Sequence, residues 1–274
     1  MTYTLLDSGY GQKLEQFGPY TLIRPCAQAV WHPHLPESEW KRADGTFSRE
    51  SGDRWRWSHQ IPSSWEIAID GISFHIQPTE FGHVGVFPEQ CSFWKRVPEL
   101  LSPHCRILNL FAYSGGSTLA CARAGASVCH LDASKGMVQW ARENAALNTL
   151  QNTPIRWIVE DVMKFLTREK RRESRYEGII LDPPSFGRGA KGEVFKIEET
   201  ILPLLSLCRD CLSNTPRFIF FSCHTPGFTP IVLRHLLEEI TIGGTIECGE
   251  MVLEGNTPSI RSVPSGAYAL WRHP

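Results

Sequence analysis

Short apolar segments alternate with longer amphipathic segments from about residue 104 onward. The apolar segments have the length of strands, and the amphipathic ones repeat their apolar residues at helical spacing. This alternation is typical of βαβ units and predicts a mostly parallel sheet of seven strands covered by helices. The last two strands follow one another without a helix, so the sheet should end in an antiparallel strand. Strands are expected at Arg106–Phe111, Ser127–Asp132, Ile155–Glu160, Gly178–Asp182, Arg217–Ser222, Thr245–Leu253 and Ala267–Trp271. Helices are expected at Ser117–Ala124, Lys135–Leu147, Val162–Arg172, Glu198–Leu212 and Pro230–Glu239, the second of them capped by Ser134.

The first part of the chain has a different pattern. Residues 1 to about 77 hold five of the nine tryptophans and several short apolar stretches. Two of these stretches, Trp65–Ile69 and Ile72–Ile76, flank the pair Asp70-Gly71, which predicts a β-hairpin because both turn positions need positive φ. We therefore expect a small β-rich domain over residues 1–77, followed by an α/β domain over residues 78–274.

Composition limits where the protein works. Hydrophobic residues make up 42% and charged residues 21% of the chain, as in ordinary globular proteins. The longest nearly apolar stretch, Ile201–Cys208, is far shorter than the roughly 20 residues of a membrane span, and the first residues lack the features of a secretory signal. Nine irregularly spaced cysteines do not suggest a disulfide framework. A cytoplasmic protein without a membrane partner is expected.

A glycine turn follows the first strand of the α/β domain. The strand around Leu108 runs into Gly115-Gly116, where the backbone can approach a ligand closely. The next strand ends at Asp132, at the distance where an acid reaches the ribose hydroxyls of a nucleoside cofactor. Glu160-Asp161, after the third strand, could accept a hydrogen bond from an adenine amino group. Because the turn lacks the Gly-x-Gly-x-x-Gly fingerprint, a dinucleotide is disfavoured.

A rigid acidic loop follows the fourth strand. In Asp182-Pro-Pro-Ser-Phe186 two prolines fix the backbone and hold carbonyl groups and the Asp182 carboxylate at the sheet edge. Such acceptors suit the amino group of a planar base, with Phe186 as a stacking wall. Asp182 and Phe186 are therefore candidate catalytic residues.

These motifs together resemble those of class I S-adenosylmethionine-dependent methyltransferases. More narrowly, they are similar to the bacterial 23S ribosomal RNA cytosine-C5 methyltransferase family, over roughly residues 78–274. The resemblance implies a Rossmann-like fold, S-adenosylmethionine as cofactor and ribosomal RNA as partner. The family's usual RNA-binding accessory domain is not evident. The cofactor-binding candidates implied are Phe87, Gln90, Asn109, Phe111, Tyr113, Gly115, Asp132, Ala133, Ser134, Asp161 and Asp182.

Among these, the resemblance gives three residues specific places. Gly115 would face the methionine end of the cofactor, Asp132 its ribose and Asp161 its adenine. Phe87 and Gln90 come from the segment Gly85-Val-Phe-Pro-Glu-Gln90 before the core.

Cys223 bears on which atom is methylated. Methylation of carbon 5 of cytosine needs a nucleophile on carbon 6, and related enzymes place a cysteine after the fifth strand, where this chain has Ser222-Cys223-His224. His224 would then lower the pKa of the thiol. Alternatively, Cys223 is a buried packing residue, and Asp182 with the Pro183 carbonyl holds an amino or ring nitrogen of guanine or adenine for methylation. The two acceptors stay open, as does a non-catalytic RNA-binding module.

Two further patterns concern RNA and metals. Arg54-Trp-Arg-Trp57 interleaves cations with aromatic rings, as single-strand nucleic-acid surfaces do, although burial of the tryptophan face is the simpler interpretation. The basic run Lys164–Arg175 suits either RNA contact or a solvated helix face. Cys208 and Cys211 have zinc-like spacing but lie in a helical pattern with no second close pair, so no metal site is expected.

Overall fold

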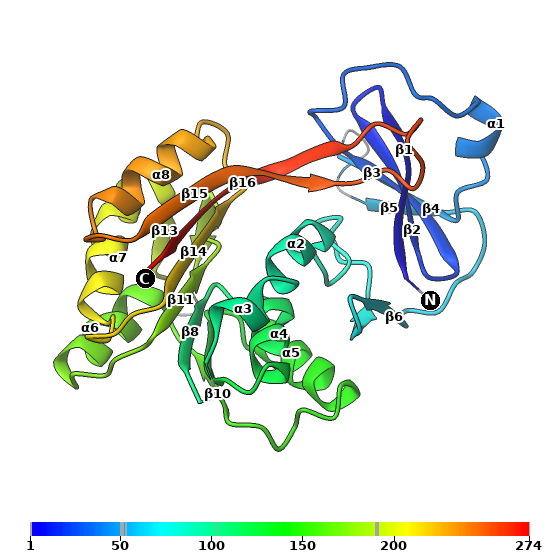
Figure 1. Cartoon of the computed structure of the whole chain (residues 1–274). Helices are drawn as coiled ribbons and strands as arrows, with labels where there is room; N and C mark the ends of the chain where they lie inside the picture. Colours follow the sequence, from blue (N-terminus) through cyan, green and yellow to red (C-terminus); the bar gives the residue numbers. More distant parts are fainter. Residues whose placement is uncertain (1, 50–51, 53, 103, 190–191, 274) are drawn as a thin grey trace. The chain divides into compact units, whose positions relative to one another are not determined.

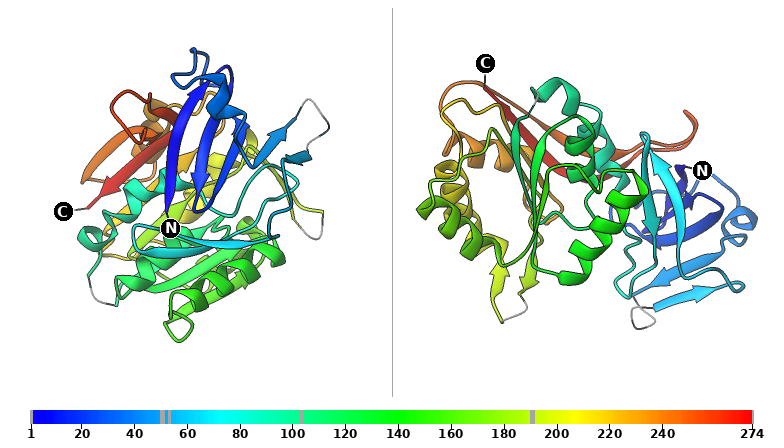
Figure 2. Two further views of the ribbon diagram at one scale, coloured as in Figure 1. Left: turned by 90° about the vertical axis from the view of Figure 1, so that its right-hand side faces the viewer. Right: turned by 90° about the horizontal axis from the view of Figure 1, so that it is seen from below.

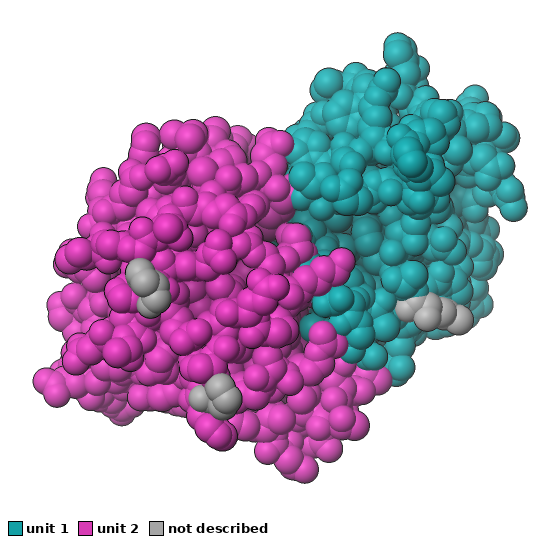
Figure 3. Space-filling view, in the orientation of Figure 1, with its two compact units in different colours: residues 1–91, 252–265 teal, residues 92–251, 266–274 magenta. Residues whose placement is uncertain are grey.

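The computed structural model describes residues 2–49, 52, 54–102, 104–189 and 192–273, and divides into two compact units (Figures 1 and 3). Unit 1 comprises Met1–Cys91 and Val252–Ser265, and unit 2 comprises Ser92–Met251 and Gly266–Pro274. The boundary expected near residue 77 falls inside unit 1. The segment of residues 252–265 also belongs to unit 1, although the sequence assigned it to the second domain.

Unit 2 is built on a seven-stranded sheet in the order β10-β9-β8-β11-β14-β16-β15. Strands β8 to β11 and β14 are parallel, and β16 is antiparallel to β14. The predicted Rossmann-like architecture is therefore confirmed. The strands are β8 (Arg106–Leu110), β9 (Ser127–Asp132), β10 (Ile155–Val159), β11 (Gly178–Leu181), β14 (Phe218–Cys223), β15 (Thr245–Leu253) and β16 (Val263–Arg272).

Helices cover both faces of this sheet. α4 and α5 lie on one face, and α6, α7 and α8 lie on the other (Figure 1). The central strands β11 and β14 are buried along their whole length, because helices cover them on both sides. The helices are α2 (Cys91–Trp94), α3 (Val97–Leu100), α4 (Gly116–Arg123), α5 (Lys135–Leu147), α6 (Val162–Arg171), α7 (Ile197–Asp210) and α8 (Pro230–Glu238). No helix among the described residues is long and apolar enough to cross a bilayer.

Unit 1 is β-rich, as predicted. Its five-stranded sheet has the order β1-β2-β3-β4-β5, and a separate hairpin joins β6 to β7. Asp70 and Gly71 at the hairpin turn have φ of 51° and 70°, so the predicted turn is confirmed. The elements are β1 (Tyr3–Gly9), β2 (Gln12–Phe17), β3 (Tyr20–Pro25), α1 (Glu37–Trp40), β4 (Gly45–Ser48), β5 (Arg54–Trp57), β6 (Trp65–Ile69), β7 (Ile72–Ile76) and η1 (Pro88–Gln90).

A buried ion pair lies within the sheet of unit 1. Glu15 on β2 accepts two hydrogen bonds from the guanidinium of Arg24 on β3, at 2.7 and 2.8 Å, and both residues are buried. The hydroxyl of Tyr3 donates to the same carboxylate at 3.0 Å. The charge of Arg24 lowers the pKa of Glu15 against the opposing effect of burial. The carboxylate therefore stays ionised inside the sheet.

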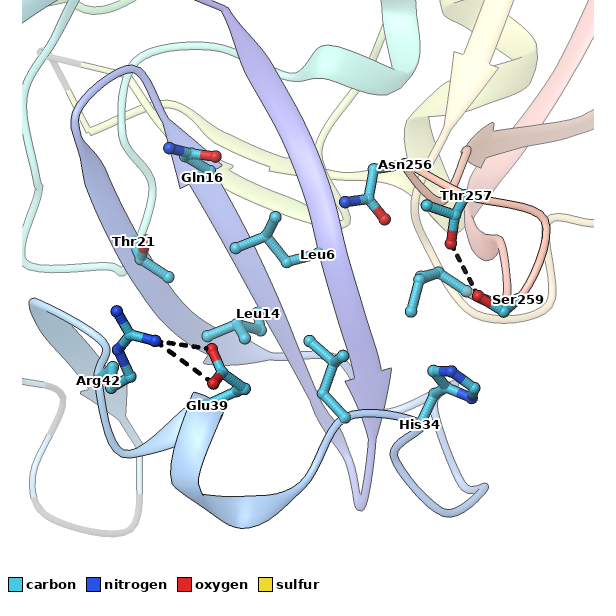
Figure 4. Close-up of a pocket in the computed structure, with 12 residues that line it drawn as sticks. Leu6, Leu14, Gln16, Thr21, His34, Glu39, Arg42, Asn256, Thr257 and Ser259 are labelled. Carbon is cyan, nitrogen blue, oxygen red and sulfur yellow. Dashed lines mark hydrogen bonds and ion pairs between the residues drawn. The ribbon is translucent and has the colours of Figure 1, made fainter.

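Unit 1 also contains a hollow between β1 and the segment of residues 252–265 (Figure 4). The segment is fixed by a bridge between Leu5 and Gly255 and by the Asn256 amide, which donates to the Leu5 carbonyl at 3.1 Å. The hollow measures about 520 Å³. Leu6 and Leu14 form part of its apolar wall.

Candidate active site

The strand order places the candidate site at a topological switch point. From β8 the chain moves outward to β9 and β10 on one side, and later continues through β11 and β14 on the other side. In open α/β sheets, ligands bind beyond the carboxyl ends of the strands at such a point. Asp132, Asp161, Asp182 and Cys223 all lie at these strand ends. The topology therefore brings the predicted acids and the cysteine to one edge of the sheet.

The turn after β8 has an unusual backbone. Phe111, Tyr113 and Gly115 have φ of 56°, 50° and 94°, a conformation that L-residues other than glycine rarely adopt. Backbone strain of this kind clusters at ligand sites and is maintained by surrounding contacts. Here the amide of Tyr113 donates to the Asp132 carboxylate at 3.0 Å. A Cβ atom on Gly115 would lie 3.1 Å from the Cβ of Ala141, so the turn packs closely on α5.

Asp132 joins this turn to the next one. Its carboxylate accepts the amide hydrogens of Tyr113 and Ser134, at 3.0 and 2.9 Å. Burial raises the pKa of Asp132, while the two amide hydrogen bonds oppose the rise. Two carboxylate oxygens offer about four acceptor positions. The two positions beyond the backbone bonds suit a pair of hydroxyl donors, as on a ribose.

Ser134 and Asp161 both cap helices. The Ser134 hydroxyl accepts the amide hydrogen of Met137 at 3.3 Å, which confirms the expected cap of α5. The Asp161 carboxylate accepts the amide hydrogen of Lys164 at 3.0 Å and starts α6. Capping engages one oxygen of Asp161, and its contact with adenine stays a prediction.

Neighbouring Glu160 is committed to an ion pair. Its carboxylate accepts a hydrogen bond from Arg168 at 2.6 Å. Lys164 and Lys170 of the same basic run pair with Glu193 and Asp210. The run on α6 is thus largely a network of surface ion pairs, as on a solvated helix face.

Asn109 belongs to a buried hydrogen-bond chain below the turn. Its amide donates to the Thr118 hydroxyl at 2.9 Å, and that hydroxyl lies 2.9 Å from Nδ1 of His130. Burial lowers the pKa of His130 to about 3, so the imidazole is neutral. Thr118 and His130 were missed, since their residue types alone gave no sign of a shared network.

The other cofactor candidates occupy several environments. The ring of Phe111 contacts Phe195 at a centroid distance of 5.1 Å. Ala133 is half-buried between Asp132 and the start of α5. Phe87 and Gln90 lie in unit 1, Gln90 at the end of η1. The contacts of these residues with a cofactor stay predictions.

The loops after β11 and β14 are joined to each other. The hydroxyls of Ser185 and Thr225 lie 2.7 Å apart. Nε2 of His224 lies 3.7 Å from the Asp182 carboxylate, at ion-pair distance. These two contacts hold an acid and an imidazole together at the same strand edge.

Phe186 begins a hairpin that sequence patterns missed. β12 (Phe186–Arg188) pairs with β13 (Val194–Lys196), and the hairpin extends from unit 2 (Figure 2). Phe186 is 52% exposed, and the guanidinium of Arg188 lies 5.7 Å from the centroid of its ring. Ala190 and Lys191, between these two strands in the sequence, lie outside the described residues. The exposed ring of Phe186, four residues after Asp182 in the sequence, is available for stacking.

Cys223 is enclosed at the end of β14. It is only 1% exposed, and burial raises the pKa of its thiol. The Asp182 carboxylate adds to this rise, while the Thr225 amide, 3.4 Å from the sulfur, opposes it. His224 lies beside Asp182. As placed, the thiol is protonated at neutral pH and buried, which favours the packing interpretation.

A metal centre is not seen in the part of the chain that the structure describes, where no three His, Cys, Asp or Glu side chains gather. Cys208 and Cys211 are buried free thiols at the end of α7. They pack in the core of unit 2.

Curated relatives match part of this chain. One from Pseudomonas aeruginosa is 34% identical over 187 residues, covering 66% of this chain and 25% of the relative. One from Pseudomonas paraeruginosa is 30% identical over the same length and coverage. Both are named ribosomal RNA large subunit methyltransferase K/L. The chain spans about a quarter of their length. The narrower likeness to the cytosine-C5 enzymes stays a prediction.

Solved structures and a family model extend the match. A SAM-dependent methyltransferase from Agrobacterium tumefaciens has a TM-score of 0.94 and 37% identity, covering 99% of this chain and 90% of that one. SMU.776, a methyltransferase solved with SAH, shares the fold with a TM-score of 0.77 and 19% identity, covering 98% of this chain and 75% of its own. The model of the S-adenosylmethionine-dependent methyltransferase family matches residues 43–205, more than half of the sequence. The chain therefore belongs to that family, and S-adenosylmethionine is its cofactor.

Proposed function

We propose that the protein methylates the exocyclic amino group of a guanine in large-subunit ribosomal RNA. The observation that carries this proposal is the strand edge where Asp182 lies beside His224 while the Cys223 thiol is buried. That edge offers an acceptor for an amine and no accessible nucleophile for a pyrimidine ring. The names of the relatives, ribosomal RNA large subunit methyltransferase K/L, supply the class of RNA.

The residues of the glycine turn fit the cofactor. Asp132 has acceptor positions for two ribose hydroxyls, and Asp161 can accept from the adenine amino group. Gly115, in the left-handed conformation, lets the backbone approach the methionine end. Phe87 and Gln90 are assigned to the same cofactor by the resemblance alone. When bound, S-adenosylmethionine supplies a methyl group made electrophilic by its sulfonium.

Asp182 and its neighbours act on the acceptor. The edge of guanine presents the N1 hydrogen beside the amino group, and two adjacent donors match the two oxygens of a carboxylate. Adenine offers an acceptor in place of that second donor, so it fits less well. The Pro183 carbonyl holds the other amino hydrogen, and Phe186 stacks on the base. The proton released on methylation passes to Asp182, which His224 flanks.

Nucleoside analysis separates this proposal from methylation of cytosine. Unmodified ribosomal RNA is incubated with tritiated S-adenosylmethionine and the full-length protein, its Asp182→Asn variant or its Cys223→Ala variant. We expect label in N2-methylguanosine that persists in Cys223→Ala and falls at least about 100-fold in Asp182→Asn, as for loss of a proton acceptor. Asp210→Asn, at a surface acid paired with Lys170, is the matched control.

Other outcomes reassign the acceptor. Label in 5-methylcytosine that vanishes in Cys223→Ala would establish the covalent mechanism and return Asp182 to a supporting role. Label in a methylated adenine would keep nitrogen as the acceptor but contradict the fit to guanine. An absence of label in ribosomal RNA would remove it as the substrate.

A further inference from the structure

Two tryptophans on β5 differ from the sequence expectation. Alternation predicted that Trp55 and Trp57 would bury one face of the strand. In the structure Trp55 is half-buried and Trp57 is 37% exposed. β5 is the outer strand of its sheet and pairs with β4 alone among the described strands. A large aromatic surface is therefore accessible at the edge of unit 1.

The two rings are held in a defined arrangement. They stack at a centroid distance of 5.0 Å with 12° between their planes. The indole nitrogen of Trp55 donates to the Thr79 carbonyl at 2.9 Å. A Cβ on Gly45, the cross-strand partner of Trp57, would overlap the Trp57 ring, so the ring lies flat against bare backbone. Preorganisation of this kind lowers the entropic cost of binding a ligand.

A hollow of about 350 Å³ opens beside these rings. This is within the range of roughly 300–1000 Å³ found for small-ligand pockets. Its wall combines flat apolar surfaces with amide side chains, which can both donate and accept hydrogen bonds. Residues that contribute are Trp55, Trp57, Pro62, Pro78, Gln60 and Gln77. A planar group with hydrogen-bonding edges matches this lining, as a nucleobase does.

The charge on the same strand indicates an anionic chain attached to that planar group. Arg54 and Arg56 are both exposed on this edge strand, and alternation places their side chains on the face opposite the tryptophans. Stacking rings and cationic side chains are the two elements with which proteins bind single-stranded nucleic acids. We propose that this hollow binds an unpaired base in a single-stranded stretch of the substrate RNA, a proposal that rests on RNA being the substrate.

The larger hollow of unit 1 lacks these features. No Trp, Tyr or Phe is present among its lining residues, all of them in the described part of the chain (Figure 4). A substitution there, Thr257→Ala, provides a matched control within the same unit.

Fluorescence anisotropy with a short, unstructured, labelled oligoribonucleotide tests the proposal on the full-length protein. We expect Trp57→Ala to weaken binding about 5- to 150-fold, the contribution of one stacked base. Trp57→Phe keeps an aromatic face and should retain most of the affinity. The slope of the logarithm of the binding constant against the logarithm of the salt concentration should be unchanged in Trp57→Ala. In Arg56→Gln this slope should fall in magnitude by about 0.7 per lost phosphate contact. The affinity of Trp57→Ala for a fully paired RNA duplex should equal that of the wild type, because the bases of a duplex are not available for stacking on the protein.

Two readouts keep this proposal distinct from the proposed function. S-adenosylmethionine binding of Trp57→Ala should equal that of the wild type, and thermal unfolding should show that the variant is folded at the assay temperature. If the wild type methylates ribosomal RNA but Trp57→Ala binds the oligoribonucleotide as tightly as Thr257→Ala does, the stacking site is refuted and the function stands. If the wild type neither binds nor methylates any RNA, both proposals fail. Equal losses in Trp57→Ala and Trp57→Phe would also refute stacking.

Discussion

Replacing Asp132 with Asn tests how the structure holds its cofactor. The carboxylate accepts one amide hydrogen from Tyr113 and one from Ser134, and we assign its remaining acceptor positions to ribose hydroxyls. Asn has one acceptor oxygen and an amino group that only donates. The substitution therefore keeps the volume of the side chain and removes half of its acceptor capacity.

The two consequences differ in size. In the free protein, the Asn oxygen can accept from half-buried Tyr113 while its amino group faces exposed Ser134, where water replaces the lost partner. The free energy of unfolding should then fall by only about 1 kcal/mol. With cofactor bound, one hydrogen bond from a hydroxyl to a charged oxygen is lost, worth about 1.5–3 kcal/mol. This corresponds to about 10- to 150-fold weaker binding.

Isothermal titration calorimetry with S-adenosylmethionine measures the affinity, and thermal unfolding without cofactor measures the stability. Asp210→Asn, which removes a surface carboxylate of the same unit, controls for the change in net charge. An affinity of Asp132→Asn within about twofold of the wild type would refute the assignment of Asp132 to the ribose, because a lost charged hydrogen bond costs more than that.

Four further predictions concern Asp132, Gly115, Glu15 and Phe186. Burial holds the pKa of Asp132 above its ordinary value of 3.8, so as pH falls the folded protein takes up this proton before the unfolded chain does. The ionised carboxylate lowers the free energy of unfolding at pH values above the raised pKa. This loss of stability is relieved as pH falls from the raised pKa to 3.8. Cofactor affinity measured by calorimetry should decline over the same window, and this decline should be absent in Asp132→Asn. Gly115→Ala, at φ of 94°, should lower stability by about 1–2 kcal/mol and weaken cofactor binding; unchanged affinity would show that the turn tolerates a side chain. Glu15→Gln leaves Arg24 charged and buried and should destabilise unit 1 by about 3–5 kcal/mol in urea unfolding, against no change for an exposed Glu37→Gln control. Phe186→Ala should raise KM for RNA without altering the affinity for cofactor, and a loss of both would assign the ring to cofactor binding instead.

Local signals predicted the elements that depend on local physics. The hairpin around Asp70-Gly71 and the Ser134 cap of α5 require specific residues at specific positions, and both are found where expected. The strands β9 and β15 have the predicted bounds, because apolar runs between turns mark buried strands.

Features that depend on contacts between distant residues could not be predicted. The segment of residues 252–265 joins unit 1 through the Leu5–Gly255 bridge, which no local pattern encodes. The side-chain amide of Asn109 donates to Thr118 because β8 packs against α4 there. Trp57 is exposed because β5 is the outer strand of its sheet and the ring faces an open hollow in the described part of unit 1. In each case the sequence shows the type of the residue but not the distant residues that surround it in the fold.

The contrast between Asp182 and Cys223 shows how such an environment decides chemistry. Their strands, β11 and β14, are neighbours and parallel, so strand order alone brings both side chains to the same acceptor. The difference comes from β16, which pairs with β14 and sets Ala267 opposite Cys223. At Gly266 a Cβ would lie 3.0 Å from the Cys223 carbonyl and 2.9 Å from the His224 ring, so β16 closes tightly over the end of β14. Cys223 is buried beside this closely packed strand, which is why we propose amine chemistry rather than a covalent mechanism at this edge.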